Sequence, residues 1–535
     1  MKSIKKFLAL ILSMTLMLTL GTAAFGAQKT LPSGKDTGSI NVTNLKPGDT
    51  VTAYQFVKAD YNEYGFTGYS AINNYVKDPV APTAQEVIDM ASNAATMTVA
   101  AEKKVATGDT EVTLNGLPVG YYLVMVTSGS ETVYSPMIAG IYYSKSATDN
   151  TLTNGAISAD SDFEIKAQKC WAKSSTPKLE KTIVTPSSKN SKGDDIAIGD
   201  KITFNLSATV PSYSKEYKKV TYKIYDIMSE GLDYVDGSMK CFIEKYENNR
   251  ENIKVTPKVN GGIIEITFDS KFILEHPGQK IQVEYQAKLN EKAGVNFDAN
   301  INKAYLEYSN NPASGSTAKT GEDKVYVYTF GIDSNLFGKS TEKWNGKTKE
   351  LIKVEEGEYQ WVETEKESGI FTTTTALEGA TFTLTNNKTK KSYTATSDKY
   401  GYLKFTGLDA GEYTLQETDA PDGFTLNDAK HTVVITAEYN QDGNLKSYTI
   451  KIDDKATSTY TATYDKGVIK TITSTKDSQG NISESAILKN SKMSFLPSTG
   501  GVGTTIFAIV GVVFVAAALG LHMILRGKSK LEQDR

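Results

Sequence analysis

Side chains that could catalyse a reaction or bind a metal are few and scattered along this 535-residue chain. The three histidines, His276, His431 and His522, lie far apart and have no spacing typical of a zinc site. We find no phosphate-binding loop, catalytic triad signature or paired glycosidase motif. We expect the adjacent carboxylates of Asp194 and Asp195 in a solvated turn rather than in a calcium site. The sequence therefore argues against an enzyme, and we expect no cofactor and no metal.

Composition narrows the class of protein further. The formal net charge of −3 provides no basic face of the size that nucleic acid requires, so we expect no nucleic-acid partner. Two cysteines, Cys170 and Cys241, are too few to brace an exported chain of this length with a disulfide framework. The sequence leaves open whether these two pair with each other.

The C-terminal end combines a short motif, an apolar run and a basic tail, in that order. The run at 502–525 contains no Asp, Glu, Lys or Arg and is long enough to cross a hydrocarbon core of about 30 Å as a helix. The basic residues that follow are expected to stay in the cytoplasm, which leaves the preceding chain outside the membrane. The motif resembles the LPXTG sorting signal of Gram-positive bacteria, and its residues are Leu496, Pro497, Ser498, Thr499 and Gly500.

This resemblance implies a processing reaction. A sortase would cleave the bond between Thr499 and Gly500 and hold the Thr499 carbonyl as a thioester on its cysteine. Pro497 fixes its own φ and favours an extended Leu496, which suits a peptide bound in a transpeptidase groove. The membrane helix would then be a transient anchor.

The N-terminal end is typical of a secretory signal peptide, which we assign to residues 1–27. Three lysines precede an apolar core at 7–20, and small residues follow. The cleavage site stays uncertain by a few residues, because both 22–24 and 24–26 allow cleavage. The chain is thus predicted to be secreted.

The remaining chain, about 470 residues long, is enough for roughly three domains. Short alternating segments such as 202–206 and 263–268 indicate half-buried strands, and one helix is expected at 83–92 with Thr83 as its N-cap. A weak repeat relates 114–123 to 405–414 and suggests that the first and last domains share a fold. We predict an all-β chain of three tandem β-sandwiches. The predicted boundaries are 28–170, 171–322 and 323–493, with the sorting signal at 494–535.

Three segments carry a specific family resemblance. Residues 413–424, YTLQETDAPDGF, resemble the E-box of pilin subunits, with Phe in place of Tyr at the last position. Residues 377–384 match the opening of Cna B-type domains, and 305–312 resemble a segment common in major pilins. With the sorting signal, the chain is identified as similar to the backbone subunit of sortase-assembled Gram-positive pili. That family implies immunoglobulin-like domains, with the first and third of Cna B type and the second closer to Cna A type.

The resemblance also implies intramolecular bonds between lysine and asparagine, each beside an acidic residue. Burial disfavours the charged ammonium and lowers its pKa, so a neutral amine can attack the carboxamide while the acid shuttles a proton to the leaving ammonia. Proximity in the folded core takes the place of a cofactor. The crosslink would restrict the unfolded chain as a disulfide does, but reductants would not break it.

The family pattern places these bonds in two domains. In the middle domain, Lys181 fits the donor, Asp226 the acid and Asn302 the acceptor. In the third domain, Glu417 matches the acid and Asn490 fits the acceptor. Lys339 is the nearest candidate for the donor, but it lies further along the first strand than the family pattern places this lysine. Two alternatives therefore stay open: the bond uses another lysine, or it is absent.

Polymerisation requires an exposed lysine that attacks the Thr499 thioester of the next subunit. Family members carry it in a YPK-like segment at the end of the first domain, and this sequence has no YPK. Residues 165–169 occupy the equivalent place, so we assign Lys169, with Lys173 and Lys166 as alternatives.

Together these features predict a structural pilus shaft subunit that supports adhesion from the cell wall of a Gram-positive bacterium. Its expected partners are a class C pilus sortase, a housekeeping sortase, identical subunits, minor or tip pilins and peptidoglycan, while a host ligand is left open. The alternatives are a singly anchored adhesin, a minor pilin and, least favoured, an anchored enzyme.

Overall fold

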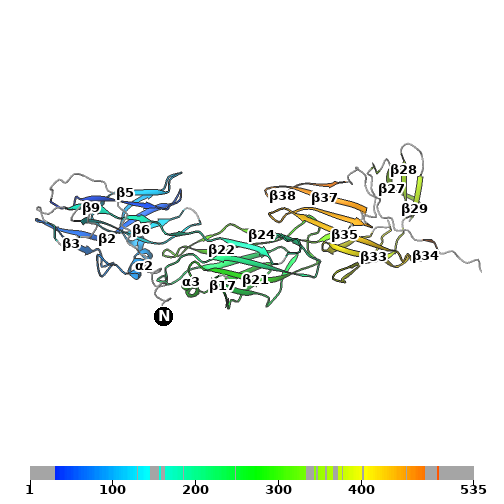
Figure 1. The fold of residues 1–535 in the computed structure, drawn as a ribbon, viewed down its shortest axis with the longest axis horizontal. Helices are drawn as coiled ribbons and strands as arrows, with labels where there is room; N and C mark the ends of the chain where they lie inside the picture. The colour runs from blue at the N-terminus through cyan, green and yellow to red at the C-terminus, as the bar shows by residue number, and fades with distance from the viewer. Residues whose placement is uncertain are drawn as a thin grey trace, which may run out of the picture.

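Strands whose side chains alternate between buried and half-exposed dominate this computed structural model. In β15 (Tyr222–Met228) the alternation is strict, as expected for a strand with one face in a core. The structure describes residues 31–475 and 491–492, apart from 129–130, 145–152, 154–155, 158–162, 185, 247–248, 333–342, 345–346, 356–357, 366–370, 376, 400–402 and 454. Figure 1 shows three β-rich units in a row along the long axis of the molecule, in chain order. The prediction of tandem β-sandwiches is confirmed.

The first unit packs a three-stranded sheet, ordered β10-β1-β5, with a larger sheet, ordered β3-β2-β6-β8-β9, in which β4 pairs with β2. The strands are β1 (Thr37–Thr43), β2 (Thr50–Asn62), β3 (Gly65–Ala71), β4 (Val99–Lys104), β5 (Glu111–Pro118), β6 (Gly120–Thr127), β7 (Val133–Tyr134), β8 (Met137–Ser144), β9 (Glu164–Ala167), β10 (Lys169–Trp171) and β11 (Ser174–Ser175). β11 pairs with β7 as a separate short ladder. This ladder lies at the end of the unit next to the middle unit.

One helix, α2 (Ala84–Ser92), followed by the short 3-10 helix η1 (Ala94–Thr96), packs in the first unit. The predicted N-cap is confirmed, because the Thr83 side chain accepts from Glu86 N–H and the Glu86 side chain accepts from Thr83 N–H. Within the described part of the chain, no helix is long and apolar enough to cross a membrane. The predicted signal peptide and the predicted span at 502–525 lie outside the described residues.

The middle unit is a sandwich of two sheets that enclose one apolar core. The first sheet, ordered β12-β14-β21-β17-β18 with β16 on β21, comprises β12 (Leu179–Ile183), β14 (Lys201–Thr209), β16 (Leu232–Tyr234), β17 (Lys240–Tyr246), β18 (Asn249–Ile253) and β21 (Lys280–Leu289). The second, ordered β13-β24-β22-β15-β20-β19 with β23 on β22, comprises β13 (Gly193–Asp195), β15, β19 (Lys258–Asn260), β20 (Ile263–Thr267), β22 (Asn300–Asn311), β23 (Ser316–Lys319) and β24 (Asp323–Tyr328). A short helix, α3 (Ser270–Glu275), follows β20.

The third unit is built on a seven-stranded sheet ordered β31-β30-β33-β35-β36-β37-β38. Its strands are β30 (Thr381–Asn386), β31 (Ser392–Thr396), β33 (Gly411–Asp419), β35 (Lys430–Tyr439), β36 (Leu445–Ile452), β37 (Lys455–Asp465) and β38 (Val468–Thr475). The smaller ladders are formed by β25 (Phe330–Ile332) with β32 (Phe405–Leu408), and by β34 (Phe424–Thr425) with β39 (Ser491–Lys492). A separate sheet holds β26 (Lys343–Trp344), β27 (Lys347–Glu355), β28 (Glu358–Glu365) and β29 (Phe371–Thr375).

The sequence repeat between the first and third units has a structural counterpart. Gly116 and Gly407 both adopt a positive φ, of 69° and 77°, which a side chain would disfavour. After each turn a tyrosine hydroxyl lies within hydrogen-bond distance of the carbonyl oxygen four residues back, Tyr122 near Pro118 and Tyr413 near Asp409. The two segments therefore form the same local turn and strand.

Candidate functional site

Three polar side chains lie in the apolar core of the middle unit. Lys181 on β12, Asp226 on β15 and Asn302 on β22 each have 0% of their surface exposed. Asp226 and Asn302 come from neighbouring strands, since Asp226 pairs with Ala304 and Met228 pairs with Asn302. Lys181 reaches them from the facing sheet. The sandwich thus brings Lys181 together with Asp226 and Asn302, which follow it in the chain by 45 and 121 positions.

Tyr285 on β21 connects all three of these side chains. Its hydroxyl donates to Asp226 Oδ1 at 2.6 Å, and it accepts from Lys181 Nζ at 3.1 Å and from Asn302 Nδ2 at 2.7 Å. The other carboxylate oxygen of Asp226 accepts from Lys181 Nζ. Lys181 and Asn302 therefore both lie within hydrogen-bond distance of a single buried oxygen.

Sequence reasoning missed Tyr285. Its segment alternates as an ordinary strand, and an inward-facing tyrosine is indistinguishable from an apolar core residue until its neighbours are known. Burial, followed by the charge of Asp226 and the hydrogen bond to it, holds the pKa of Tyr285 well above its ordinary value. The hydroxyl therefore keeps its proton and remains a hydrogen-bond donor to the carboxylate.

The surroundings of Lys181 favour a neutral amine. Burial lowers the pKa of its ammonium, opposed by the charge of Asp226 and the hydrogen bond to it. The rings of Phe204 and Tyr285 lie 5.0 Å and 5.3 Å from Nζ, so the amine is enclosed by aromatic surface. Among the described residues, Asn302 Oδ1 has no hydrogen-bond partner. This carbonyl oxygen is therefore open to protonation during attack by the amine.

In the third unit the structure describes one of the three predicted residues. Glu417 on β33 is 2% exposed, and its Oε2 accepts from the backbone N–H of Asn427 at 2.7 Å. Lys339 and Asn490 lie outside the described residues. The strand that follows Asn490 is described, and it pairs Ser491 with Thr425, two residues before Asn427.

The candidate linkage lysines lie at the end of the first unit. Lys169 is exposed at the start of β10, a strand that pairs in parallel with β1. Lys173 is also exposed, whereas the side chain of Lys166 is 15% exposed and forms an ion pair with Glu164 at 2.9 Å. Within the described part of the chain, neither Lys169 nor Lys173 has a hydrogen-bonded or charged partner for its ammonium. The sorting signal at 496–500 lies outside the described residues.

Comparison with known proteins agrees with these features. Residues 35–174 match a T6 antigen Ig-like domain, 371–450 a SpaA-type prealbumin-like fold domain, and 489–530 an LPXTG cell wall anchor motif. The trypsin-resistant surface T6 protein of Streptococcus pyogenes serotype M6 is 27% identical over 93% of this chain and 96% of its own length. The solved structure of the T6 backbone pilin of serotype M6 Streptococcus pyogenes has a TM-score of 0.58, with 21% identity, and covers 86% of this chain and 100% of its own.

This chain is a homologue of the T6 backbone pilin. This homology confirms the prediction of a pilus shaft subunit and of a structural rather than enzymatic role. The anchor motif confirms a cell-wall location on a Gram-positive surface and marks this pilin homologue as a sortase substrate.

The cysteines of the pilin homologue are not paired. Cys170 belongs to the first unit and Cys241 to the middle unit, and both are free and 5% exposed. Burial raises the pKa of each thiol to about 12. The thiols are therefore core residues and contribute no crosslink.

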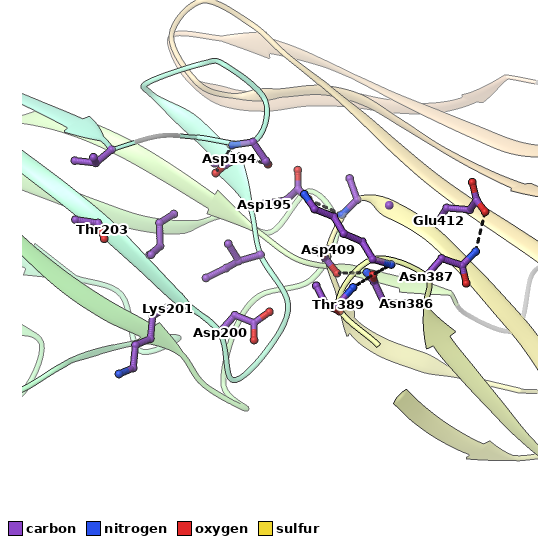
Figure 2. Close-up of a pocket in the computed structure, with 17 residues that line it drawn as sticks. Asp194, Asp195, Asp200, Lys201, Thr203, Asn386, Asn387, Thr389, Asp409 and Glu412 are labelled. Carbon is purple, nitrogen blue, oxygen red and sulfur yellow. Dashed lines mark hydrogen bonds between the residues drawn. The ribbon is translucent and has the colours of Figure 1, made fainter. Parts of the chain in front are cut away.

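A polar cleft of about 690 Å³ lies between the middle and third units of the pilin homologue. Figure 2 shows Asp194 and Asp195 on one side and Asn386 and Asp409 on the other. The expectation that Asp194 and Asp195 occupy a solvated turn is wrong: they lie on β13, are 4% and 5% exposed, and are covered because β13 pairs with β24 beneath the third unit.

The carboxylates of this cleft are bound by the protein itself. Ser187 donates to Asp194, Tyr439 and the Ala410 N–H donate to Asp195, and Tyr413 donates to Asp409. In the residues that the structure describes, no group of three or more His, Cys, Asp or Glu side chains could hold a metal ion. We interpret the cleft as part of the joint between two units of the shaft.

Proposed function

We propose that copies of this chain are joined covalently into a fibre, with Thr499 of one copy linked to Lys169 of the next. A pilus-specific sortase would form the thioester at Thr499, and the neutral amine of Lys169 would attack its carbonyl. The new C–N bond replaces the C–S bond, and the proton of the amine passes to the departing cysteine thiolate. A housekeeping sortase would transfer the last subunit to peptidoglycan, and minor or tip pilins would complete the fibre.

The observation that supports this proposal most directly is the homology along almost the whole chain, together with the anchor motif. The exposure of Lys169 at the end of the first unit supports the choice of lysine, because a sortase-bound thioester needs an accessible amine. In Figure 1 the first unit lies at the opposite end of the row from the third unit, after which the sorting signal follows. Head-to-tail joining of such units extends the row.

We further propose that the middle unit carries an intramolecular bond between Lys181 and Asn302. The neutral amine attacks the Asn302 carboxamide carbon, the new C–N bond replaces the amide C–N bond, and ammonia leaves. Asp226 lends a proton to the carbonyl oxygen, takes one from the attacking nitrogen and passes that proton to the departing amino group, which leaves as ammonia, and the proton on the oxygen then returns to Asp226. The bond would join β12 of one sheet to β22 of the other, so tension along the shaft could not separate the two sheets at that point.

For the third unit we propose an equivalent bond that uses Glu417 as the acid and Asn490 as the acceptor. Lys339 remains the candidate donor. The buried, hydrogen-bonded carboxyl of Glu417 supports the first of these assignments.

Mass spectrometry of SDS-boiled wall digests tests the linkage. The expected product is a branched peptide in which Thr499 is joined to Lys169. A Lys169→Arg variant should lose the ladder of covalent multimers, while the matched Lys173→Arg variant should keep it. A single species that carries Thr499 only on wall peptide would instead indicate a singly anchored adhesin.

A further inference from the structure

The last strand of the third unit's large sheet, β38, exposes several large apolar side chains. Val468, Ile469 and Ile472 are 69%, 38% and 53% exposed, and every side chain described on this strand, at 468–473, is exposed. β38 stands at the end of the strand order, so β37 is the one described strand that pairs with it. The other side of its backbone forms an open sheet edge in the described part of the chain.

Two of these residues continue the core face of the sheet. Ile472 pairs with Ala462 on β37, and Ile469 pairs with Tyr464. Ala462 is 6% exposed in the core of the third unit, and Tyr464 packs against that core. Because opposed residues of antiparallel strands share a face, both isoleucines lie on the core side, and a register shift after Thr463 keeps them there. The apolar face therefore extends one strand beyond the part that the described residues cover.

This edge has few of the features that keep edge strands from pairing. Unpaired N–H and C=O groups bind a further strand readily, so edges are usually short or carry prolines and several charges. β38 is eight residues long, contains no proline and has one charged side chain, Lys470. The chemistry of this edge thus selects another β-strand with an apolar face.

The sequence of β38 is complementary to itself. When two copies of the strand pair antiparallel with Ile469 of one opposite Ile472 of the other, the same contact forms twice about a twofold axis. Lys470 then faces Thr471 of the other copy, so the two lysines are not directly opposed. A second copy of this chain therefore supplies a matching strand without any change of sequence.

A fibre of this chain would present β38 once in each copy, at an interval that any other fibre of the same chain shares. Two fibres can therefore form many of these contacts in step, and contacts that are weak singly become strong together. Figure 1 shows β38 on the flank of the row of units rather than at either end, so head-to-tail joining leaves it accessible.

We propose that β38 pairs with β38 of a second copy and so joins pilus fibres side by side. This inference rests on the shaft function and adds a lateral contact to it. The paired strands are antiparallel and run roughly along the row in Figure 1, so the two fibres point in opposite directions. The contact thus suits fibres that meet from two facing cells.

The experiment uses fibres isolated from a Gram-positive host that expresses the full chain with its pilus sortase. Electron micrographs give the fraction of fibres that lie in lateral bundles, and Ile472→Lys should lower that fraction by about tenfold, because the weakened contact recurs in every copy. Val259→Lys is the matched control, since Val259 is 43% exposed on β19, the edge strand of a sheet in the middle unit. Both variants should unfold at the wild-type temperature, because both positions are exposed.

A charge pair tests the register and the identity of the partner. Fibres of Ile472→Lys and fibres of Ile469→Glu should each remain single, whereas a mixture of the two should form bundles again. In the mixed pair one contact joins lysine to glutamate and the other keeps the two isoleucines. A mixture that stays single would exclude the proposed register.

Other outcomes overturn the proposal while the shaft function stands. Equal bundling by the Ile472→Lys and Val259→Lys fibres would show that β38 is not the contact. Hydrogen exchange at β38 as slow in single fibres as in bundles would show that residues 476–490 of the same chain cover the strand instead. A failure of the shaft function is distinct, because no covalent fibres would then form.

Discussion

The hydroxyl of Tyr285 donates a 2.6 Å hydrogen bond to Oδ1 of Asp226 inside the core of the middle unit. This bond leaves Oδ2 of Asp226 directed at the amine of Lys181. The carboxyl is therefore oriented by one neighbour while it contacts the amine of the proposed nucleophile, Lys181, which is the arrangement that a proton shuttle needs.

We predict that Asp226→Ala prevents the bond between Lys181 and Asn302. The intact mass of the variant, corrected for the substitution, should exceed that of the wild type by one ammonia. Its free energy of unfolding should fall by about 2–5 kcal/mol, the typical effect of losing a crosslink. Asp323→Ala is the control, because Asp323 accepts from the backbone N–H of Lys181 and leaves the amine contact intact. An intact mass of the wild-type protein that shows no loss of ammonia would contradict the proposed bond.

Tyr285→Phe should slow formation of the proposed bond without abolishing it, because the substitution removes the hydroxyl that orients Asp226 and contacts both Lys181 and Asn302. The measurement is the fraction of chains that have lost ammonia at a fixed time after refolding. Tyr222→Phe provides a comparison in the same core, because the Tyr222 hydroxyl has no partner among the described residues. Equal slowing by both variants would point to packing rather than to the hydroxyl.

At the joint between the middle and third units, Tyr439→Phe should lower the free energy of unfolding by about 1.5–3 kcal/mol, the usual range for a hydrogen bond to a charged group. The lost bond is the 2.6 Å contact from Tyr439 to Asp195. Tyr393→Phe should be close to neutral, since the Tyr393 hydroxyl is buried without a partner in the described part of the chain. Thermal or denaturant unfolding of both variants measures the difference.

Asp195 should make stability depend on pH. Burial raises its pKa from 3.8 to about 6, against hydrogen bonds from Tyr439 and Ala410 that lower it. The folded chain holds this proton more tightly than the unfolded chain. The contribution of Asp195 to the free energy of unfolding, about 3 kcal/mol, is therefore fully present below about pH 4 and is lost as the pH rises to about 6.

Asp195→Asn should therefore lose less stability than the wild type between pH 4 and pH 6.5, as followed by denaturant unfolding across that range. Asp236→Asn, at an exposed turn of the same unit, should retain the wild-type slope. If the two variants have the same profile, Asp195 is not the group responsible.

The two thiols should be inert in the folded protein. Burial raises the pKa of Cys170 and of Cys241 to about 12, so almost no thiolate is present at neutral pH. Iodoacetamide should modify neither residue under native conditions and both after denaturation, and reductant should leave the unfolding temperature unchanged. Rapid native modification of either thiol would contradict the burial.

The sequence by itself determined the features that a linear pattern can encode. The cell wall anchor motif that includes residues 496–500 is carried by the order of its residues alone. The alternation of β14 and β20 predicted half-buried strands, because side chains on a strand point to opposite faces in turn. The order of Lys181, Asp226 and Asn302 followed from a family pattern, and the capping box at Thr83 followed from local spacing.

Only the tertiary structure decided which side chains meet across the sheets. The contact of Tyr285 with Lys181 depends on how two sheets stack, which no local pattern encodes. The burial of Asp195 depends on the third unit, whose Tyr439 lies 244 residues further along the chain. Likewise, the exposure of Trp171 beside buried Cys170 and Ala172 depends on which face of β10 the rest of the first unit covers. Local spacing specifies strands and motifs, whereas burial and pKa depend on packing between segments distant in the chain.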